Sequence, residues 1–404
     1  MITRQDGSVW ASGRNTYGEL GIDTKSDSVT DFVTVFSDVA NAIATGGAHS
    51  IVLKQDGSVW ATGRNHYGQL GDGSTTNSPH FIEVVSEGVK AVAAGLTHTI
   101  VVKEDDSVWV VGCNSHGQLG IGSEVDRHTF IEALVLEYGV KDVVAGAVHT
   151  LVLGIDGTMW AAGSNRFGQL GITSMHSPSQ SFSDTDSMKE VSASKNSFVK
   201  VLFTNTKAIA AGSYHSMVLK EDDSVWVMGN NEFGQLGDGS PNSRTMRRAI
   251  KGEEEFFNAK AVAAGLYHSV VLEVNGDVWS TGGNEVGQLE FGSKTSKRAF
   301  VLVSSGVQAV AAGGWHSIVQ KQDDSFWAVG RNNYGQLGDG SKIDRTEFVR
   351  LMQISDGGTY IIGVSLRNFS WRQDFAPCPC IIQNTPVSRV YARSSCLSIS
   401  ALAN

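Results

Sequence analysis

Residues 49–74 read HSIVLKQDGSVWATGRNHYGQLGDGS, and closely similar stretches begin at five further histidines. The six starting residues are His49, His98, His149, His215, His268 and His316. A catalytic motif needs one copy, because one transition state is stabilised by one set of groups. Repetition of the whole stretch therefore indicates an architectural unit.

Two landmarks define this unit: a Gly three residues before each His, and a Trp 14 residues after that Gly. The tryptophans are Trp60, Trp109, Trp160, Trp226, Trp279 and Trp327. Successive tryptophans are separated by 49, 51, 66, 53 and 48 residues. A repeat with a period near 50 residues is typical of a propeller or a solenoid.

The composition of each unit favours β-structure. Residues 50–54 and 59–61 are β-prone runs on either side of Asp56-Gly57, a pair that predicts a hairpin with a type I′ turn. The loop Gly-x-Asn-x-x-Gly-Gln-Leu-Gly follows the Trp strand, and we expect its leucine to be buried between units. These leucines are Leu20, Leu70, Leu119, Leu170, Leu236, Leu289 and Leu337.

The two ends of the chain carry complementary halves of the unit. Trp10 has no Gly-x-x-His before it, and Gly363 has no Trp 14 residues later. If the halves pair, an all-β, seven-bladed β-propeller results, in which no sheet edge is left exposed. The predicted propeller spans residues 1–371, with a half-unit 1–38, repeats 39–88, 89–139, 140–206, 207–258, 259–306 and 307–350, and a closing half-unit 351–371. Residues 372–404 do not match the repeat and are expected to form an irregular or disordered tail.

Composition narrows the classes of partner and compartment. The net charge of −9 argues against a protein held on nucleic acid mainly by phosphate contacts. No apolar run is long enough for a membrane span, and the four cysteines form neither a disulfide framework nor a zinc spacing. We therefore expect a cytoplasmic or nuclear protein, or one found in both places. Whether Met1 is the natural start stays open.

Motifs of enzyme chemistry are missing from the sequence. It contains no phosphate loop, no nucleophile elbow, no His-Glu-x-x-His and no paired Cys-x-x-Cys. The six histidines occupy equivalent positions around a ring, so we interpret them as structural groups that satisfy backbone atoms of their own or the next blade. We predict no catalytic, cofactor-binding or metal-binding residues.

The combination of Gly-x-x-His-[Ser/Thr], Asp-Gly-x-Val-Trp and the Gly-x-Asn loop resembles the regulator of chromosome condensation repeat family. The resemblance covers about residues 1–371 and implies a seven-bladed propeller closed by both ends of the chain. Members of that family include an exchange factor for the Ran GTPase, repeat domains of ubiquitin ligases, a plant photoreceptor and a β-lactamase-inhibiting protein. The photoreceptor's Trp two residues before the His is absent here, so light sensing is not expected.

Two functions stay open at this stage. The first is a monomeric scaffold that binds a protein partner, because a rigid disc with variable loops offers broad faces and no reaction. The alternative is a guanine-nucleotide exchange factor for a Ran-like small GTPase, which needs no phosphate loop of its own. A Ser-rich insertion within residues 171–206 lengthens one connection and is a further candidate contact.

Residues that differ from unit to unit are the best candidates for binding. The residue before the repeated His is Ala48, Thr97 and Val148 in three units, but Tyr214, Tyr267 and Trp315 in the next three. A propeller would align the latter as an aromatic arc on one face. Such side chains are common in binding hot spots, so we predict Tyr214, Tyr267 and Trp315 as the partner-binding site. The alternative is that they only fill the central channel.

Overall fold

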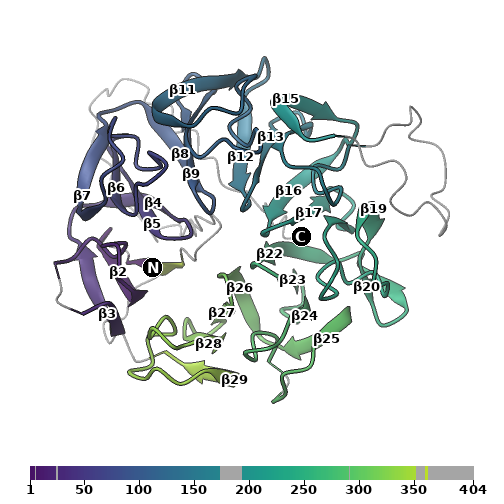
Figure 1. Ribbon diagram of the computed structural model, residues 1–404. Coiled ribbons are helices and arrows are strands. Elements are labelled where there is room, and N and C mark those ends of the chain that lie inside the picture. The colour runs from purple at the N-terminus through teal and green to yellow at the C-terminus, as the bar shows by residue number, and fades with distance from the viewer. Residues whose placement is uncertain (5, 24–25, 173–192, 291, 352–359, 363–404) are drawn as a thin grey trace, which may run out of the picture.

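The computed structural model describes residues 1–404 except 5, 24–25, 173–192, 291, 352–359 and 363–404. All its regular elements are strands, and the described residues contain no helix, hence none that could span a membrane. Seven sheets stand around a common axis as the blades of a propeller (Figure 1). The predicted fold is confirmed. The predicted tail and most of the Ser-rich insertion lie outside the described residues.

The blades are numbered in chain order. Blade 1 contains β1 (Ile2–Arg4), β2 (Val9–Arg14), β3 (Ser28–Phe36) and β30 (Tyr360–Ile362), and blade 2 contains β4 (Ala40–Thr45), β5 (His49–Lys54), β6 (Val59–Gly63) and β7 (Ser78–Val85). Blade 3 contains β8 (Val89–Ala94), β9 (His98–Lys103), β10 (Ser107–Gly112) and β11 (Arg127–Val135), and blade 4 contains β12 (Val140–Ala145), β13 (His149–Gly154), β14 (Met159–Gly163) and β15 (Lys195–Val201). Blade 5 contains β16 (Thr206–Ala211), β17 (His215–Lys220), β18 (Val225–Gly229) and β19 (Arg244–Arg248). Blade 6 contains β22 (Ala259–Ala264), β23 (His268–Glu273), β24 (Val278–Gly282) and β25 (Lys297–Ser304), extended by β20 (Ile250–Lys251) and β21 (Glu254–Glu255), and blade 7 contains β26 (Val307–Ala312), β27 (His316–Lys321), β28 (Phe326–Gly330) and β29 (Arg345–Arg350).

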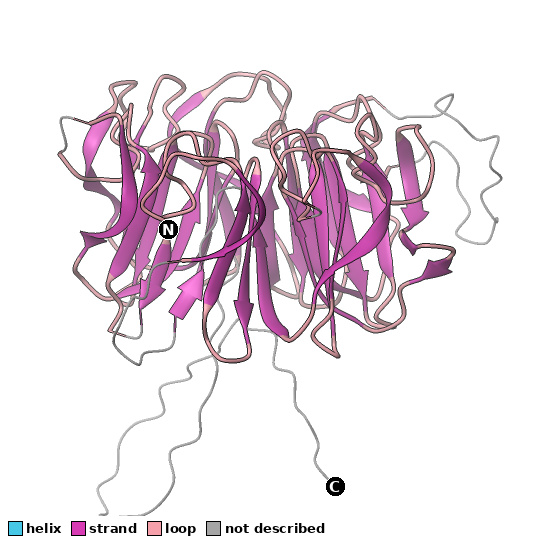
Figure 2. Cartoon of the chain, turned by 90° about the horizontal axis from the view of Figure 1, so that it is seen from below, coloured by secondary structure: helices cyan, strands magenta, loops and turns pink. Residues whose placement is uncertain are grey.

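Blade 1 is built from both ends of the chain. Strand β30 pairs antiparallel with β1, with Ile2 opposite Ile362 and Arg4 opposite Tyr360. The closing strand thus covers the backbone edge of β1, which would otherwise be free to pair with another chain. Figure 2 shows the disc from its side, with the strands running between its two faces.

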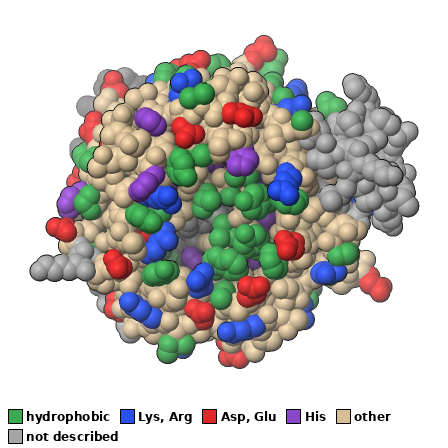
Figure 3. Space-filling view, viewed as in Figure 1, with side chains coloured by type: hydrophobic (Ala, Val, Ile, Leu, Met, Phe, Trp, Pro, Cys, Tyr) green, Lys and Arg blue, Asp and Glu red, His purple; other side chains and the backbone are tan. Residues whose placement is uncertain are grey.

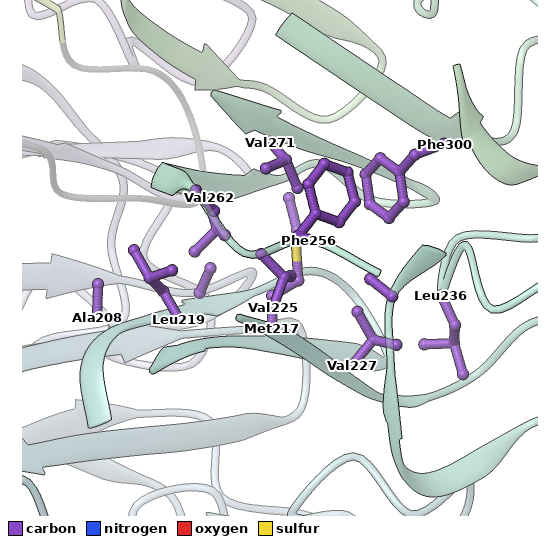
Figure 4. Packing of buried hydrophobic residues seen from close by; sticks show 14 residues of the cluster. Ala208, Met217, Leu219, Val225, Val227, Leu236, Phe256, Val262, Val271 and Phe300 are labelled. Carbon is purple, nitrogen blue, oxygen red and sulfur yellow. The ribbon is translucent and has the colours of Figure 1, made fainter. Parts of the chain in front are cut away.

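The hydrophobic core is divided into layers between neighbouring blades. The largest layer joins blades 5 and 6 and contains Met217 and Leu236 from one blade and Phe256 and Phe300 near the other (Figure 4). The repeated loop leucines are at most 5% exposed in all seven units, as predicted. Each blade therefore buries its apolar face by packing against its neighbours. Because the ring is closed, every blade has a neighbour on both sides.

The hairpin after the repeated His differs from the prediction. Gly57 has a φ of 81° and its N–H donates to the carbonyl of Lys54, while Asp56 does not have a positive φ. A type I′ turn needs two residues with positive φ, so the turn is a type I turn followed by one left-handed residue. Oδ1 of Asp56 accepts from the N–H and Oγ of Ser58, which explains why Asp, Gly and Ser recur together.

Candidate interaction face

The repeated histidines join neighbouring blades. Five of the six rings bond, through Nε2, a hydroxyl of the next blade at 2.9–3.0 Å. The pairs are His49 with Thr99, His98 with Thr150, His149 with Ser216, His215 with Ser269, and His268 with Ser317. Each hydroxyl in turn donates to a backbone carbonyl, as Thr99 does to Gln69 at 2.6 Å. In these five pairs the imidazole is thus linked to a backbone carbonyl through a hydroxyl of the next blade.

The Gly three residues before each His leaves space for the ring. A Cβ on Gly95 would lie 2.3 Å from Cε1 of His98 and 2.5 Å from the carbonyl oxygen of Gly146. Burial lowers the pKa of His98 to about 3 and that of His49 to about 4, so both rings are neutral at pH 7. Among the described residues, no three His, Cys, Asp or Glu side chains are grouped so that they could hold a metal ion.

A backbone hydrogen bond places two variable positions of each unit side by side. The residue before the His accepts from the N–H of the residue after the loop glycine, at 2.7–2.9 Å. The pairs are Ala48 with Arg64, Thr97 with Cys113, Val148 with Ser164, Tyr214 with Asn230, Tyr267 with Gly283, and Trp315 with Arg331. We call the end of the propeller that carries these pairs the loop face. Its variable side chains are held on a rigid backbone.

The predicted residues Tyr214, Tyr267 and Trp315 are half-buried on the loop face. The ring centroids of Tyr267 and Trp315 are 5.2 Å apart, and Phe233 lies 5.1 Å from Tyr267. Tyr214 contacts Phe167 at 5.8 Å. We call Tyr214, Tyr267 and Trp315 the aromatic arc. Figure 3 shows apolar side chains gathered over the centre of the disc, with charged side chains around them.

The three residues line two cavities, one of which has a volume of about 450 Å³. Tyr214 and Tyr267 line it together with Phe167, Arg166 and Glu232, while Trp315 lines a different cavity with Arg14 and Arg331. Burial raises the pKa of the Tyr267 hydroxyl, and the nearby Tyr214 and Glu232 raise it further. The structure thus brings a cation, a carboxylate and three aromatic rings to one hollow.

Sequence reasoning missed several residues of the loop face. Phe167 and Phe233 occupy the fifth position of the Gly-x-Asn loop, and their rings contact Tyr214 and Tyr267. Arg331, Arg14 and Arg64 occupy the second position of that loop in three consecutive blades. The signal was present in the sequence, because these positions also differ from unit to unit, but which of these side chains lie together depends on the closed ring.

Two models of the family described as "Regulator of chromosome condensation (RCC1) repeat" match this chain. One matches residues 56–102, 105–153 and 222–272, and the other matches residues 41–69, 89–118, 140–169, 207–235 and 259–288. The chain belongs to the regulator of chromosome condensation repeat family.

Two curated proteins are similar to parts of this sequence. The chain is 31% identical to the X-linked retinitis pigmentosa GTPase regulator homolog of Caenorhabditis elegans over 158 residues. This segment is 38% of this chain and 10% of that protein. It is 29% identical to the protein RCC2 homolog of Danio rerio over 155 residues. This segment is 37% of this chain and 28% of that protein. The matched segments thus span between about a tenth and about a quarter of these relatives.

Two solved structures have the same fold. Human WBSCR16 superposes with a TM-score of 0.73 at 19% identity, covering 86% of this chain and 94% of that one. Prp20p from Saccharomyces cerevisiae superposes with a TM-score of 0.71 at 20% identity, covering 88% of each chain. Prp20p is described with its binding properties to Gsp1p and histones. At these identities the likeness concerns the propeller fold.

Proposed function

We propose that this propeller is a protein-interaction scaffold that binds its partner on the loop face, with the aromatic arc as the contact. The observation that carries the proposal is the row of Phe233, Tyr267 and Trp315, whose ring centroids are 5.1 and 5.2 Å apart. Half-buried aromatic rings held by neighbouring rings lose little conformational freedom when a partner covers them. This property is typical of binding hot spots.

The arc is confined to one part of the loop face, which supports a role beyond folding. The equivalent positions Ala48, Thr97 and Val148 have small side chains, yet their blades form the same hydrogen bonds to the loop. Large aromatic side chains are therefore not needed to build a blade. The fold alone does not explain why three consecutive units have them.

The test is a triple variant, Tyr214→Ser, Tyr267→Ser and Trp315→Ser, compared with the wild type in affinity capture from cell extract. Its matched control is Ala48→Ser, Thr97→Ser and Val148→Ser, which places the same side chain at the equivalent positions of the other blades. The proposal expects capture of the main partner to be lost only in the aromatic variant. If the aromatic variant keeps both its melting temperature and its partners, the arc only fills space.

A second candidate function is nucleotide exchange on a Ran-like small GTPase. It is favoured by the relatives named as GTPase regulators and by Prp20p, which is described as binding Gsp1p. An exchange factor acts by stabilising the nucleotide-free partner, so it needs no catalytic side chain. The test loads Ran and related GTPases with a fluorescent nucleotide and follows its release. Many-fold acceleration by substoichiometric amounts of the chain establishes exchange; unchanged release leaves the scaffold function.

The remaining properties belong to the same proposal. We expect a monomer whose partner is a protein rather than a nucleic acid, found in the cytoplasm, the nucleus or both. The net charge of −9 supports the choice of partner, because it opposes binding to a polyanion. Light scattering on the purified chain tests the monomer, and imaging of the tagged protein in cells tests its location.

A further inference from the structure

Three arginines form a second variable surface on the loop face. Arg331, Arg14 and Arg64 follow the loop glycine in blades 7, 1 and 2, which are neighbours because blade 1 closes the ring. The equivalent residues of the other blades are uncharged: Cys113, Ser164, Asn230 and Gly283. We call Arg331, Arg14 and Arg64 the arginine arc.

Tyrosine rings lie against two of these arginines, Arg14 and Arg64. The guanidinium carbon of Arg14 lies 5.9 Å from the ring centroid of Tyr334 and 5.7 Å from that of Tyr17. That of Arg64 lies 5.4 Å from Tyr17 and 5.8 Å from Tyr67. Cations and rings therefore alternate from one blade to the next, and the rings limit the movement of the long side chains.

Arg331 joins this arc to the aromatic arc. Its guanidinium carbon lies 6.0 Å from the ring centroid of Trp315. Arg331, Arg14, Trp315 and Tyr334 also line one cavity. The arginine arc and the proposed binding site are therefore parts of one continuous surface.

Among the described residues, only one of the three arginines has a carboxylate partner. Nε of Arg14 lies 2.6 Å from Oε1 of Glu19, and Nη2 of Arg14 donates to the carbonyl of Gly47. Glu19 stands where the other loops have Gln. Arg64 and Arg331 form no ion pair with any carboxylate of the described residues. Two oriented cations are thus left for a ligand on a chain whose overall charge is negative.

We propose that the arginine arc binds an acidic, Asp- or Glu-rich segment of the protein partner, with Arg64 and Arg331 pairing with its carboxylates. This inference rests on the proposed scaffold function and names the chemistry of the partner. Guanidinium groups suit carboxylates because their planar N–H donors match the two oxygens. Glu232 and Glu285 lie on the loops of blades 5 and 6 and repel an acidic segment there. The segment is therefore directed toward blades 7, 1 and 2.

A single-stranded nucleic acid also offers anions, but this surface suits it less. Such binders use free aromatic faces on which bases stack. Here Tyr17 already has two guanidinium groups over its ring. The rest of the chain is acidic, which opposes a polyanion that extends beyond the arc.

The experiment uses the full chain and a fluorescent ten-residue peptide of alternating Asp and Ser, with binding followed by anisotropy. The peptide with Asn in place of Asp is the uncharged control. In the variant Arg64→Gln, Arg331→Gln we expect the Kd for the Asp peptide to rise by about tenfold, as two partly exposed ion pairs are lost. The matched control Lys294→Gln, Lys342→Gln removes the same charge from exposed positions outside the arc and leaves the Kd unchanged.

Each other outcome overturns the proposal. These outcomes are no saturable binding of the Asp peptide, equal binding of the Asn peptide, or an equal loss in both double variants. Binding of a single-stranded oligonucleotide that competes with the peptide and depends on the same arginines would replace the acidic segment with nucleic acid. If the peptide does not bind but capture still depends on Tyr214, Tyr267 and Trp315, the scaffold function stands and only the acidic partner is excluded.

Discussion

His98 of blade 3 donates a hydrogen bond from Nε2 to Oγ1 of Thr150 in blade 4, across 3.0 Å. The direction follows from the hydroxyl, whose only proton is donated to the carbonyl of Gln118 at 2.7 Å. Both side chains are fully buried. One residue from each of two blades and one loop carbonyl thus form a chain of hydrogen bonds that fixes the position of one blade against the next.

The first prediction concerns this contact. Thr150→Val keeps the shape of the side chain but leaves the Nε2 proton of His98 and the carbonyl of Gln118 without a partner. We expect a loss of about 1–3 kcal/mol in the free energy of unfolding, measured by urea denaturation. Thr150→Ser is the control, because Ser occupies this position in blades 5, 6 and 7. Equal losses in both variants would show that packing of the methyl group matters and the hydroxyl does not.

The second prediction compares the steric clash expected at Gly95 with the backbone strain expected at Gly88. Gly95→Ala places a methyl group 2.3 Å from Cε1 of His98 and 2.5 Å from a backbone oxygen, so we expect a loss of about 3 kcal/mol or more. Gly88→Ala meets no atom within 4 Å, but Gly88 has a φ of 76°. Its loss is expected to be about 1 kcal/mol. Thermal denaturation of both variants checks the order, and a reversed order contradicts the close contact with the ring.

The third prediction uses Glu290, which stands where the other six loops have Gly. It keeps the left-handed turn with a φ of 60°, so a residue other than Gly strains the backbone of an otherwise unchanged turn. Replacement by Gly removes this strain, and we expect the free energy of unfolding to rise by about 1 kcal/mol. A lower melting temperature for Glu290→Gly would contradict this account.

Glu290 also predicts a dependence of stability on pH. Burial raises the pKa of its carboxyl group to about 8, and Oε2 is buried without a hydrogen-bond partner. Because this pKa is raised in the folded state, the favourable contribution is complete below the usual value of 4.5 and is lost as the pH rises toward 8. Glu290→Gln should therefore lose less stability than the wild type between these pH values. The exposed Glu124→Gln is the control, and identical profiles for all three proteins would exclude the effect.

The fourth prediction tests the closure of the ring. A chain ending at Arg350 lacks β30 and exposes the edge of β1, whereas a chain ending at residue 371 keeps the strand that pairs with Ile2, Thr3 and Arg4. We expect the shorter chain to melt at a lower temperature and to aggregate, because an uncovered strand edge pairs with other chains. Equal melting temperatures for the two chains would refute closure by β30.

The candidate site was only partly accessible from the sequence. The aromatic arc followed from comparing one position across the units, and in the structure Tyr267 lies against Trp315. Tyr214 contacts Phe167 of the preceding blade, and it lines one cavity together with Tyr267. Spacing within one unit does not indicate the contact with Phe167. The arginine arc was missed because Arg331 and Arg14 come together only through the closure of the ring.

The sequence by itself determined the blade: where its strands lie, where its hairpin turns and which leucine is buried. The strands and the hairpin depend on contacts within one unit of about 50 residues, and the leucine recurs at the same place in every unit, so each repeat carries the whole pattern. Only the tertiary structure decided which side chains of different units meet, such as His98 with Thr150 and Arg14 with Tyr334. The physical reason is that these contacts depend on the curvature and closure of the ring, which arise from the packing of all seven blades together.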